Sequence, residues 1–124
     1  MVQVIADRRE IDFVLHEQFD VSRLSKHDKF SEFTRKTADM IISEARTLAN
    51  KEILPTMKIG DETGLRYENG NVTVPAEFKQ AWNQLIQGGW FAPCQNPEWG
   101  GQGMPRLLHV MAQNYLIGLL TAQA

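Results

Sequence analysis

Cysteine is nearly absent from this 124-residue sequence, in which Cys94 stands alone. A single cysteine cannot form an internal disulfide, so we expect a reducing compartment, with the cytoplasm as the default location. An excess of positive charge is absent too, because thirteen Lys and Arg face fifteen Asp and Glu, for a formal net charge of -2. Nucleic acids and anionic membrane surfaces select proteins with a positive excess, so we expect no nucleic-acid partner.

Long hydrophobic runs are also missing. The most apolar stretch, residues 107–122, is interrupted by His109, Gln113 and Asn114, and it is shorter than the ~20 residues that a membrane-spanning helix needs. Residues 1–10 carry four charged side chains, and they lack the apolar core of a signal peptide. We therefore expect neither a membrane span nor a secretion signal.

Charge is scarce in the second half of the sequence. Residues 1–66 hold eleven of the thirteen basic and twelve of the fifteen acidic residues, whereas residues 67–124 hold five charged residues. These five are Glu68, Glu77, Lys79, Glu98 and Arg106. Soluble monomers face water with a mixed charged surface, so the charge-poor half predicts that something covers it.

Helical periodicity dominates the first half, and the length and the 43% hydrophobic content fit one globular domain. A short apolar stripe predicts a helix over residues 7–19, within an N-terminal arm that covers residues 1–30. The strongest helix signal covers residues 31–54, where we expect Ser31 to cap the start and Pro55 to break or kink the helix. The segment then continues to its predicted end at Gly60. Its apolar face is expected to comprise Phe33, Thr37, Met40, Ile41, Ala45, Leu48, Ala49 and Ile53.

Turn residues organise the second half. The Asn69-Gly70 pair, with Tyr, Val and Thr around it, predicts a small β-hairpin near residues 65–74. A helix follows over residues 75–87, with Phe78, Ala81, Trp82, Leu85 and Ile86 on its apolar stripe, and Gly88-Gly89 ends it. A structured loop leads to a final helix over residues 105–121 that is apolar almost all round and therefore central. We expect an all-α helical bundle with a small hairpin insertion, its main domain covering residues 31–124.

The usual catalytic and metal-binding residues form no obvious set. His16, His27 and His109 lie on different predicted elements, without the spacing that places two imidazoles on one metal ion. His109 on an apolar helix is more typical of a hydrogen-bonded core residue than of a ligand. Cys94 has no neighbouring His or basic group that would activate it as a nucleophile. We therefore assign no catalytic residue and no metal ligand.

The glycine-rich segment around Gly100, Gly101 and Gly103 allows two interpretations. Exposed backbone amides before a helix can hold a phosphate. The dinucleotide fingerprint, however, requires a further glycine where this chain has Arg106, and it requires a preceding strand. We favour a structural loop, in which Pro97, Glu98 and the three glycines form a compact turn. Trp90 and Trp99 would then anchor that turn by packing.

The same loop carries a family resemblance. Gly88-Gly89-Trp90, followed by PEWGGQGMP at residues 97–105, resembles the corresponding segment of acyl-CoA dehydrogenases. The likeness extends in order through most of residues 4–116, and it departs from the family pattern after about Ile117. Further matching segments are DFVL at residues 12–15, FSEF at 30–33, GDETG at 60–64, Asn69-Gly70, Val74-Pro75 and Phe78-Lys79.

The resemblance implies a function for the intact family enzyme. Such an enzyme dehydrogenates an acyl-CoA thioester between its α and β carbons, and FAD accepts the hydride. The subgroup resembled includes enzymes that act on methylthiopropionyl-CoA-like and other short or unusual acyl groups. This chain resembles the N-terminal helical domain alone, truncated before the β-domain and the C-terminal helical domain that hold the catalytic base and most flavin contacts.

We therefore expect the chain alone to be inactive and to hold no cofactor. By resemblance, Tyr115, Leu116 and Leu119 on the final helix would lie nearest the acyl chain. The expected partners are the remaining enzyme domains or a second copy in a homo-oligomer, with acyl-CoA as the substrate of the intact enzyme. The alternative is a stand-alone helical interaction or oligomerisation module without catalysis.

Overall fold

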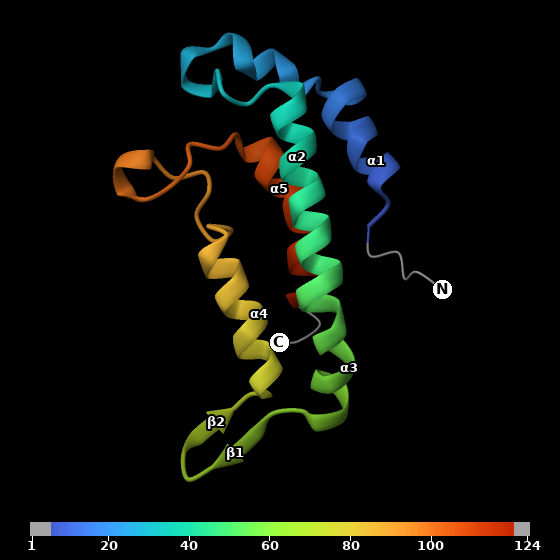
Figure 1. The fold of residues 1–124 in the computed structure, drawn as a ribbon, viewed down its shortest axis with the longest axis vertical. Coiled ribbons are helices and arrows are strands. Elements are labelled where there is room, and N and C mark those ends of the chain that lie inside the picture. Colours follow the sequence, from blue (N-terminus) through green and yellow to red (C-terminus); the bar gives the residue numbers. More distant parts are fainter. Residues whose placement is uncertain (1–5, 121–124) are drawn as a thin grey trace.

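Two long helices, α2 (Arg35–Leu48) and α5 (Arg106–Leu120), form the centre of the molecule. The computed structural model describes the backbone of residues 6–120 and the side chains of residues 6–117. Figure 1 shows α5 lying behind α2, with α1 on one side, α4 on the other, and the hairpin at the far end. The predicted all-α bundle with a small β-hairpin is confirmed.

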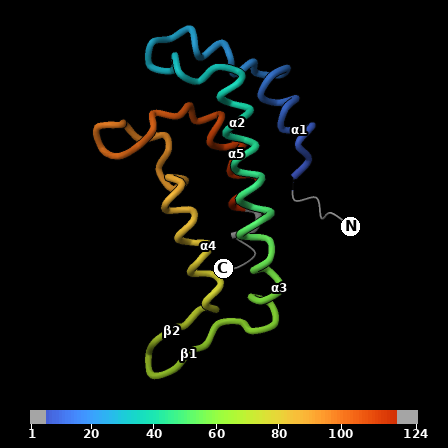
Figure 2. The backbone as a smooth tube through the Cα atoms, in the orientation of Figure 1, coloured from blue at the N-terminus to red at the C-terminus, as the bar shows by residue number. Residues whose placement is uncertain are grey.

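The N-terminal segment is a series of short helical turns. The α-helix α1 (Arg8–Asp12), capped by the side chain of Asp7, continues into the π-helical η1 (Phe13–Gln18). Two 3-10 helices follow, η2 (Val21–Lys26) and η3 (Asp28–Phe30). The tube in Figure 2 shows this segment folding back over the start of α2. Ile11, Leu15 and Val21 are buried, so the segment contributes to the same core as the later helices.

The helix predicted over residues 31–54 begins later and is interrupted. The prediction that Ser31 caps it is wrong, because α2 begins at Arg35 and the side chain of Thr34 accepts a hydrogen bond from the Thr37 amide. Ser31 belongs to the preceding turn, where its own amide donates to the Asp28 carbonyl. Thr34 caps α2 instead of Ser31, because the chain first turns to bury Phe33.

The interruption predicted at Pro55 is present as a widened turn. The π-helical η4 (Ala49–Ile53) directly precedes α3 (Leu54–Thr63), which has Pro55 in its first turn. A proline lacks the amide that an ordinary helix would donate to a carbonyl four residues earlier, and a wider turn relieves that conflict. The helix then runs through Gly60, where we predicted its end, and stops before Gly64, whose φ of 65° suits glycine.

The core lies mainly where α2 and η4 pack against α5. Small side chains let the helices approach closely, because Ala38, Ala45, Ala49 and Ala112 are all fully buried. The predicted apolar face of α2 is rotated, since Met40 is exposed and Ile42 is buried in its place. The buried core residues are Ile11, Leu15, Val21, Phe33, Ala38, Ile42, Ala45, Ala49, Ile53, Ala81, Leu85, Met104, Leu108, Ala112, Tyr115 and Leu116.

The hairpin and α4 (Ala76–Gln87) form the outer part of the molecule. Strands β1 (Arg66–Glu68) and β2 (Asn71–Thr73) pair antiparallel, with Tyr67 opposite Val72. Asn69 and Gly70 both take the positive φ angles that their turn requires. Helix α4 contacts α3 and η4 through a narrow strip, so Trp82 and Ile86 of its predicted stripe stay half exposed. Within residues 6–120, no helix combines the length and apolar character that crossing a bilayer requires.

Candidate functional site

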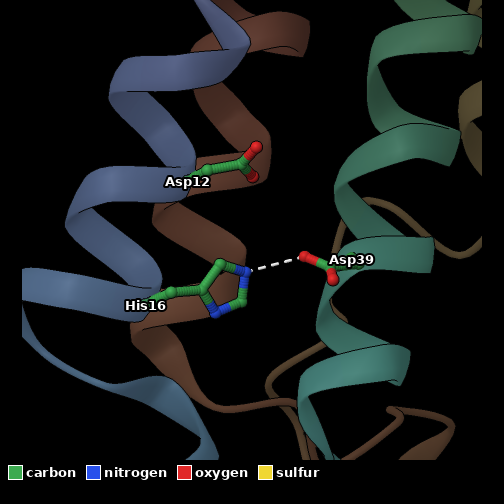
Figure 3. A group of neighbouring side chains, drawn as sticks. All are labelled: Asp12, His16 and Asp39. Carbon is green, nitrogen blue, oxygen red and sulfur yellow. Dashed lines mark hydrogen bonds and ion pairs between the residues drawn. The ribbon is translucent and has the colours of Figure 1, made fainter.

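A cluster of polar side chains joins the N-terminal segment to α2. The Arg8 guanidinium donates from Nε to Asp12 Oδ1 at 2.8 Å and from Nη1 to the Ser43 hydroxyl at 2.9 Å. His16 Nε2 lies 2.7 Å from Asp39 Oδ1, and Arg8 Nη2 lies 3.7 Å from the same oxygen. Figure 3 shows the His16 ring, from the N-terminal segment, facing Asp39 on α2, with Asp12 one turn away.

The sequence carries a signal for this cluster in the spacing of its polar residues, which the apolar periodicity does not reveal. Arg8, Asp12 and His16 recur every four residues, and so do Asp39 and Ser43. Residues four apart share one face of a helix, so each set forms a polar stripe. Pairing the two stripes requires the tertiary fold, because they are separated by more than twenty residues.

The geometry of the cluster does not assemble a nucleophile with a base. The His16 side chain is only 4% exposed, and its pairing with Asp39 resembles the way a carboxylate orients a general base. The nearby hydroxyl, Ser43, is instead bonded to Arg8. A hydroxyl nucleophile needs a direct hydrogen bond to its base, and the hydroxyl of Ser43 is bonded to Arg8 rather than to His16.

A metal ion is the other chemistry that these side chains could support. One ligand atom from each of Asp12, His16 and Asp39 lies within 4.8 Å of the other two. The Arg8 guanidinium, however, contacts both carboxylates and balances part of their charge. A metal ion would have to displace this guanidinium. That the chain holds no metal ion remains a prediction.

The three residues expected near an acyl chain, Tyr115, Leu116 and Leu119, have different surroundings from one another. Tyr115 is 1% exposed, and its hydroxyl has no hydrogen-bond partner among the described residues. Burial raises the pKa of Tyr115, while the positive charges of Arg46 and Arg8 oppose the shift. Leu116 instead lines a hollow of about 250 Å³ on the α4 side of α5. The side chain of Leu119 lies outside the described residues.

Large apolar side chains are exposed on α4, on α5 and at Phe91, and two of them, Phe91 and Ile117, line the hollow at Leu116. The Trp82 and Phe91 rings are in contact, with their centroids 4.5 Å apart, and both are about half exposed. Ile86 lies one helical turn after Trp82, and Ile117 lines the hollow together with Phe91. We call Trp82, Ile86, Phe91 and Ile117 the α4–α5 face.

The glycine-rich loop uses its backbone amides internally. The amides of Gly100, Gly101 and Gly103 donate to the carbonyls of Pro97, Asn96 and Gln95, and those of residues 99, 102 and 104 also donate within residues 93–104. Glu98 donates its amide to the Asn96 side chain. Amides already bonded within the loop cannot cradle a phosphate, so the hydrogen bonding favours the compact turn.

The packing roles of the two loop tryptophans differ. Trp90 is half buried against the core, as expected. The prediction that Trp99 anchors the loop is wrong, because its side chain is 81% exposed. The close contact is made by Gly101, where an added Cβ would clash with the backbone carbonyl of Gln95. The backbone, rather than an aromatic anchor, therefore packs this turn.

His109 and Cys94 lie close to this loop without forming a reactive pair. Burial lowers the pKa of His109, although a hydrogen bond to the Trp90 backbone opposes the shift. Burial raises the pKa of the Cys94 thiol, with Arg106 opposing it. A cysteine nucleophile needs a depressed pKa, so burial acts against catalysis at Cys94.

Comparison with known proteins gives one informative relative. No family model matches the chain. The chain is similar to the 3-methylmercaptopropionyl-CoA dehydrogenase of Ruegeria pomeroyi, with 29% identity over 104 residues, which are 84% of this chain and 18% of that enzyme. The chain thus spans less than a fifth of the relative's length. The resemblance to acyl-CoA dehydrogenases that the loop motifs indicate is confirmed by this similarity.

Proposed function

We propose that the chain acts as the N-terminal helical domain of an FAD-dependent acyl-CoA dehydrogenase. The observation that carries the proposal is the similarity to the Ruegeria enzyme, which extends over 84% of this chain but over 18% of that enzyme. Most of the described bundle is therefore matched to a small part of a larger enzyme. In the intact enzyme, the domain would cover the substrate cavity and pack against the other domains.

The α4–α5 face supports this role. Its four large side chains are between 40% and 53% exposed, and they belong to the half of the sequence that holds five charged residues. Burying such side chains is favourable by roughly 25 cal/mol per Å² of apolar surface. Contact with another domain would bury the face.

FAD does not fit the part of this chain that most resembles a phosphate cradle. The amides of residues 99–104 are all donated to acceptors of the same loop. A pyrophosphate would have to compete with these bonds. We therefore place the flavin on other domains of the intact enzyme and assign no catalytic step to this chain.

Of Tyr115 and Leu116, Leu116 is the one that lines a hollow, and its side chain is 3% exposed. It lines the hollow together with Leu85, Trp90, Phe91, Ile117 and the polar Gln113. Tyr115 faces the core and would support the wall from behind. A short acyl group meets aliphatic and aromatic side chains in such a hollow, as ligand pockets commonly provide.

A domain exchange tests the proposal. The matching 104 residues of the Ruegeria enzyme are replaced by those of this chain, and the product is assayed for bound FAD and for bleaching by 3-methylmercaptopropionyl-CoA. We expect both to persist, and Ile86→Glu to impair assembly of the exchanged enzyme because it places a charge on the α4–α5 face. Val72→Glu, which changes a hairpin residue that is 62% exposed against 53% for Ile86, is the control. A well-folded exchange product that lacks flavin would contradict the proposal.

Inactivity of the chain alone is tested separately. The purified chain is mixed with FAD and acyl-CoA thioesters, and we expect no stoichiometric flavin and no turnover. A yellow chain that oxidises an acyl-CoA would contradict this part of the proposal. Reading the coding sequence beyond Ala124 for a β-domain gives an independent test.

A stand-alone helical interaction module is the second candidate, because the same exposed face could bind a second copy of the chain. Size-exclusion chromatography with light scattering tests it. A concentration-dependent dimer that Ile86→Glu abolishes would favour the module. A monomer that binds no apolar dye would argue against both candidates.

A further inference from the structure

A basic hollow lies at the opposite end of the bundle from the hairpin. Its volume is about 600 Å³, within the range of small-molecule sites. It lies between η2 and the first turn of α5, which contributes Leu107. Phe19, Arg23, Lys26 and His27 line the other side. The hollow is therefore lined by both apolar and basic side chains.

The charge of this hollow is unbalanced. Arg23, Lys26 and His27 face a single lining carboxylate, Asp20, which accepts a hydrogen bond from the Ser22 hydroxyl. Within residues 6–117, none of the three basic side chains has an ion pair or a side-chain hydrogen bond. The start of α5 adds the positive end of a helix dipole. These charges together favour an anion.

A second hollow of similar size shows that volume alone does not produce this imbalance. It measures about 580 Å³ along α2, and its lining pairs the cations Arg35 and Lys36 with the carboxylates Asp39 and Glu44. Its formal charge is balanced. The hollow at η2 thus differs in charge rather than in size, and the α2 hollow provides a matched control.

We propose that the hollow at η2 binds a phosphorylated nucleotide. Arg23 and Lys26 would hold the phosphate through charge-assisted hydrogen bonds. The half-exposed Phe19 ring, which lines the same hollow as Leu107, offers the base an aromatic surface for stacking. The chemistry is shared by a free nucleotide and by the nucleotide end of coenzyme A. The inference does not depend on the proposed function, because it rests on the charges and shape of one hollow.

Titration of the full chain tests the inference. Adenosine 5′-monophosphate and adenosine 3′,5′-bisphosphate are added while amide shifts are followed by NMR, and affinities are measured by calorimetry. We expect saturable shifts at residues 19–27 and at Leu107. Tighter binding of the bisphosphate would identify the coenzyme A end as the source, and equal binding would identify a free nucleotide. Adenosine and inorganic phosphate alone should each bind more weakly.

Variants separate specific binding from general charge. Arg23→Gln combined with Lys26→Gln should weaken nucleotide binding at least about tenfold, because two charge-assisted bonds are lost. Arg35→Gln combined with Lys36→Gln removes the same charge from the α2 hollow and should leave the affinity unchanged. Phe19→Leu should weaken binding of the nucleotides but not of inorganic phosphate. All five of these side chains are exposed, so melting temperatures should be retained.

Three results would overturn the inference. The first is the absence of saturable shifts at residues 19–27 with either nucleotide. The second is an equal loss of affinity in the two double variants, which would indicate general electrostatic attraction. The third is inorganic phosphate binding as tightly as the nucleotides, which would remove any role for the Phe19 ring.

Discussion

Two regions of the molecule differ in how they are built. One is the interface between the N-terminal segment and α2, and the other is the α4–α5 face. At the first, Arg8, Asp12, His16 and Asp39 bind one another across two elements. At the second, Trp82 and Ile86 remain half exposed. The first interface is held by charged side chains that pair with one another, whereas the second presents large apolar side chains to solvent.

The difference indicates which part of the surface is complete. In the polar cluster, the charged groups of Arg8, Asp12 and Asp39 pair within the chain, and one buried atom, His16 Nδ1, has no hydrogen-bond partner among the described residues. Large apolar side chains gathered on one face are typical of interaction surfaces. The comparison therefore places the expected contact with other domains at α4 and α5, which agrees with the charge-poor second half of the sequence.

The largest difference in stability is expected between two truncations of an aliphatic side chain, one in each of the two regions compared. Leu15→Ala removes a fully buried side chain of the N-terminal segment and should lower the free energy of unfolding by about 2–5 kcal/mol. Ile86→Ala changes the half-exposed α4–α5 face and should cost less than about 1 kcal/mol. Urea unfolding measures both. Equal losses would show that the α4–α5 face is already buried, for example by self-association.

A smaller effect is expected from Gly101→Ala in the compact loop. The added Cβ would meet the backbone of Gln95, and overpacking of this kind costs about 1–3 kcal/mol. Gly100→Ala is the control, because that position has open space but a φ of 87°. It should cost about 1 kcal/mol from backbone strain alone. A larger loss at Gly100, measured by thermal unfolding, would contradict the packing assigned to the loop.

Breaking the polar cluster should cost less than truncating Leu15. Asp39→Ala leaves the buried His16 ring without its partner, and the expected loss of unfolding free energy is about 1–2 kcal/mol. Glu44→Ala, on an exposed position of the same helix, should change it by less than about 0.5 kcal/mol. Chemical denaturation compares the two variants. The same loss in both would show that the cluster contributes no more than a surface charge does.

Elements that depend on local chemistry could be predicted from the sequence. Asn69-Gly70 predicts the hairpin because few residue pairs tolerate two positive φ angles in succession. The interruption near Pro55 follows from the missing amide of proline. The start of α2 could not be fixed in this way, because Ser31 and Thr34 are both able to cap a helix. The burial of Phe33 decides between them.

Features that depend on the tertiary fold were not predictable to the same degree. The exposure of Met40 and Trp99 follows from how α2 and the loop pack, and hydrophobicity alone suggested the reverse. The polar cluster required the N-terminal segment to lie beside α2. The spacing of Arg8, Asp12 and His16 is compatible with a polar stripe that was not predicted from the sequence, and only the fold identifies Asp39 as its partner.

The smallest expected effect is the pH dependence of stability that His109 on α5 produces, and it tests the α4–α5 side of the comparison. Burial lowers the pKa of His109 below its ordinary value of 6.5. The unfolded chain then takes up a proton at His109 before the folded chain does, so the contribution of His109 to stability is present above pH 6.5 and is lost as pH falls towards the folded pKa. Urea unfolding is compared at about pH 7.5 and about pH 5.5. The free energy of unfolding should decrease less between these two pH values for His109→Gln than for the unmodified chain, because the variant lacks the contribution of His109 and is otherwise identical. An identical decrease would show that His109 is solvated like an exposed histidine, and that the α4–α5 side of the molecule is more open than its packing indicates.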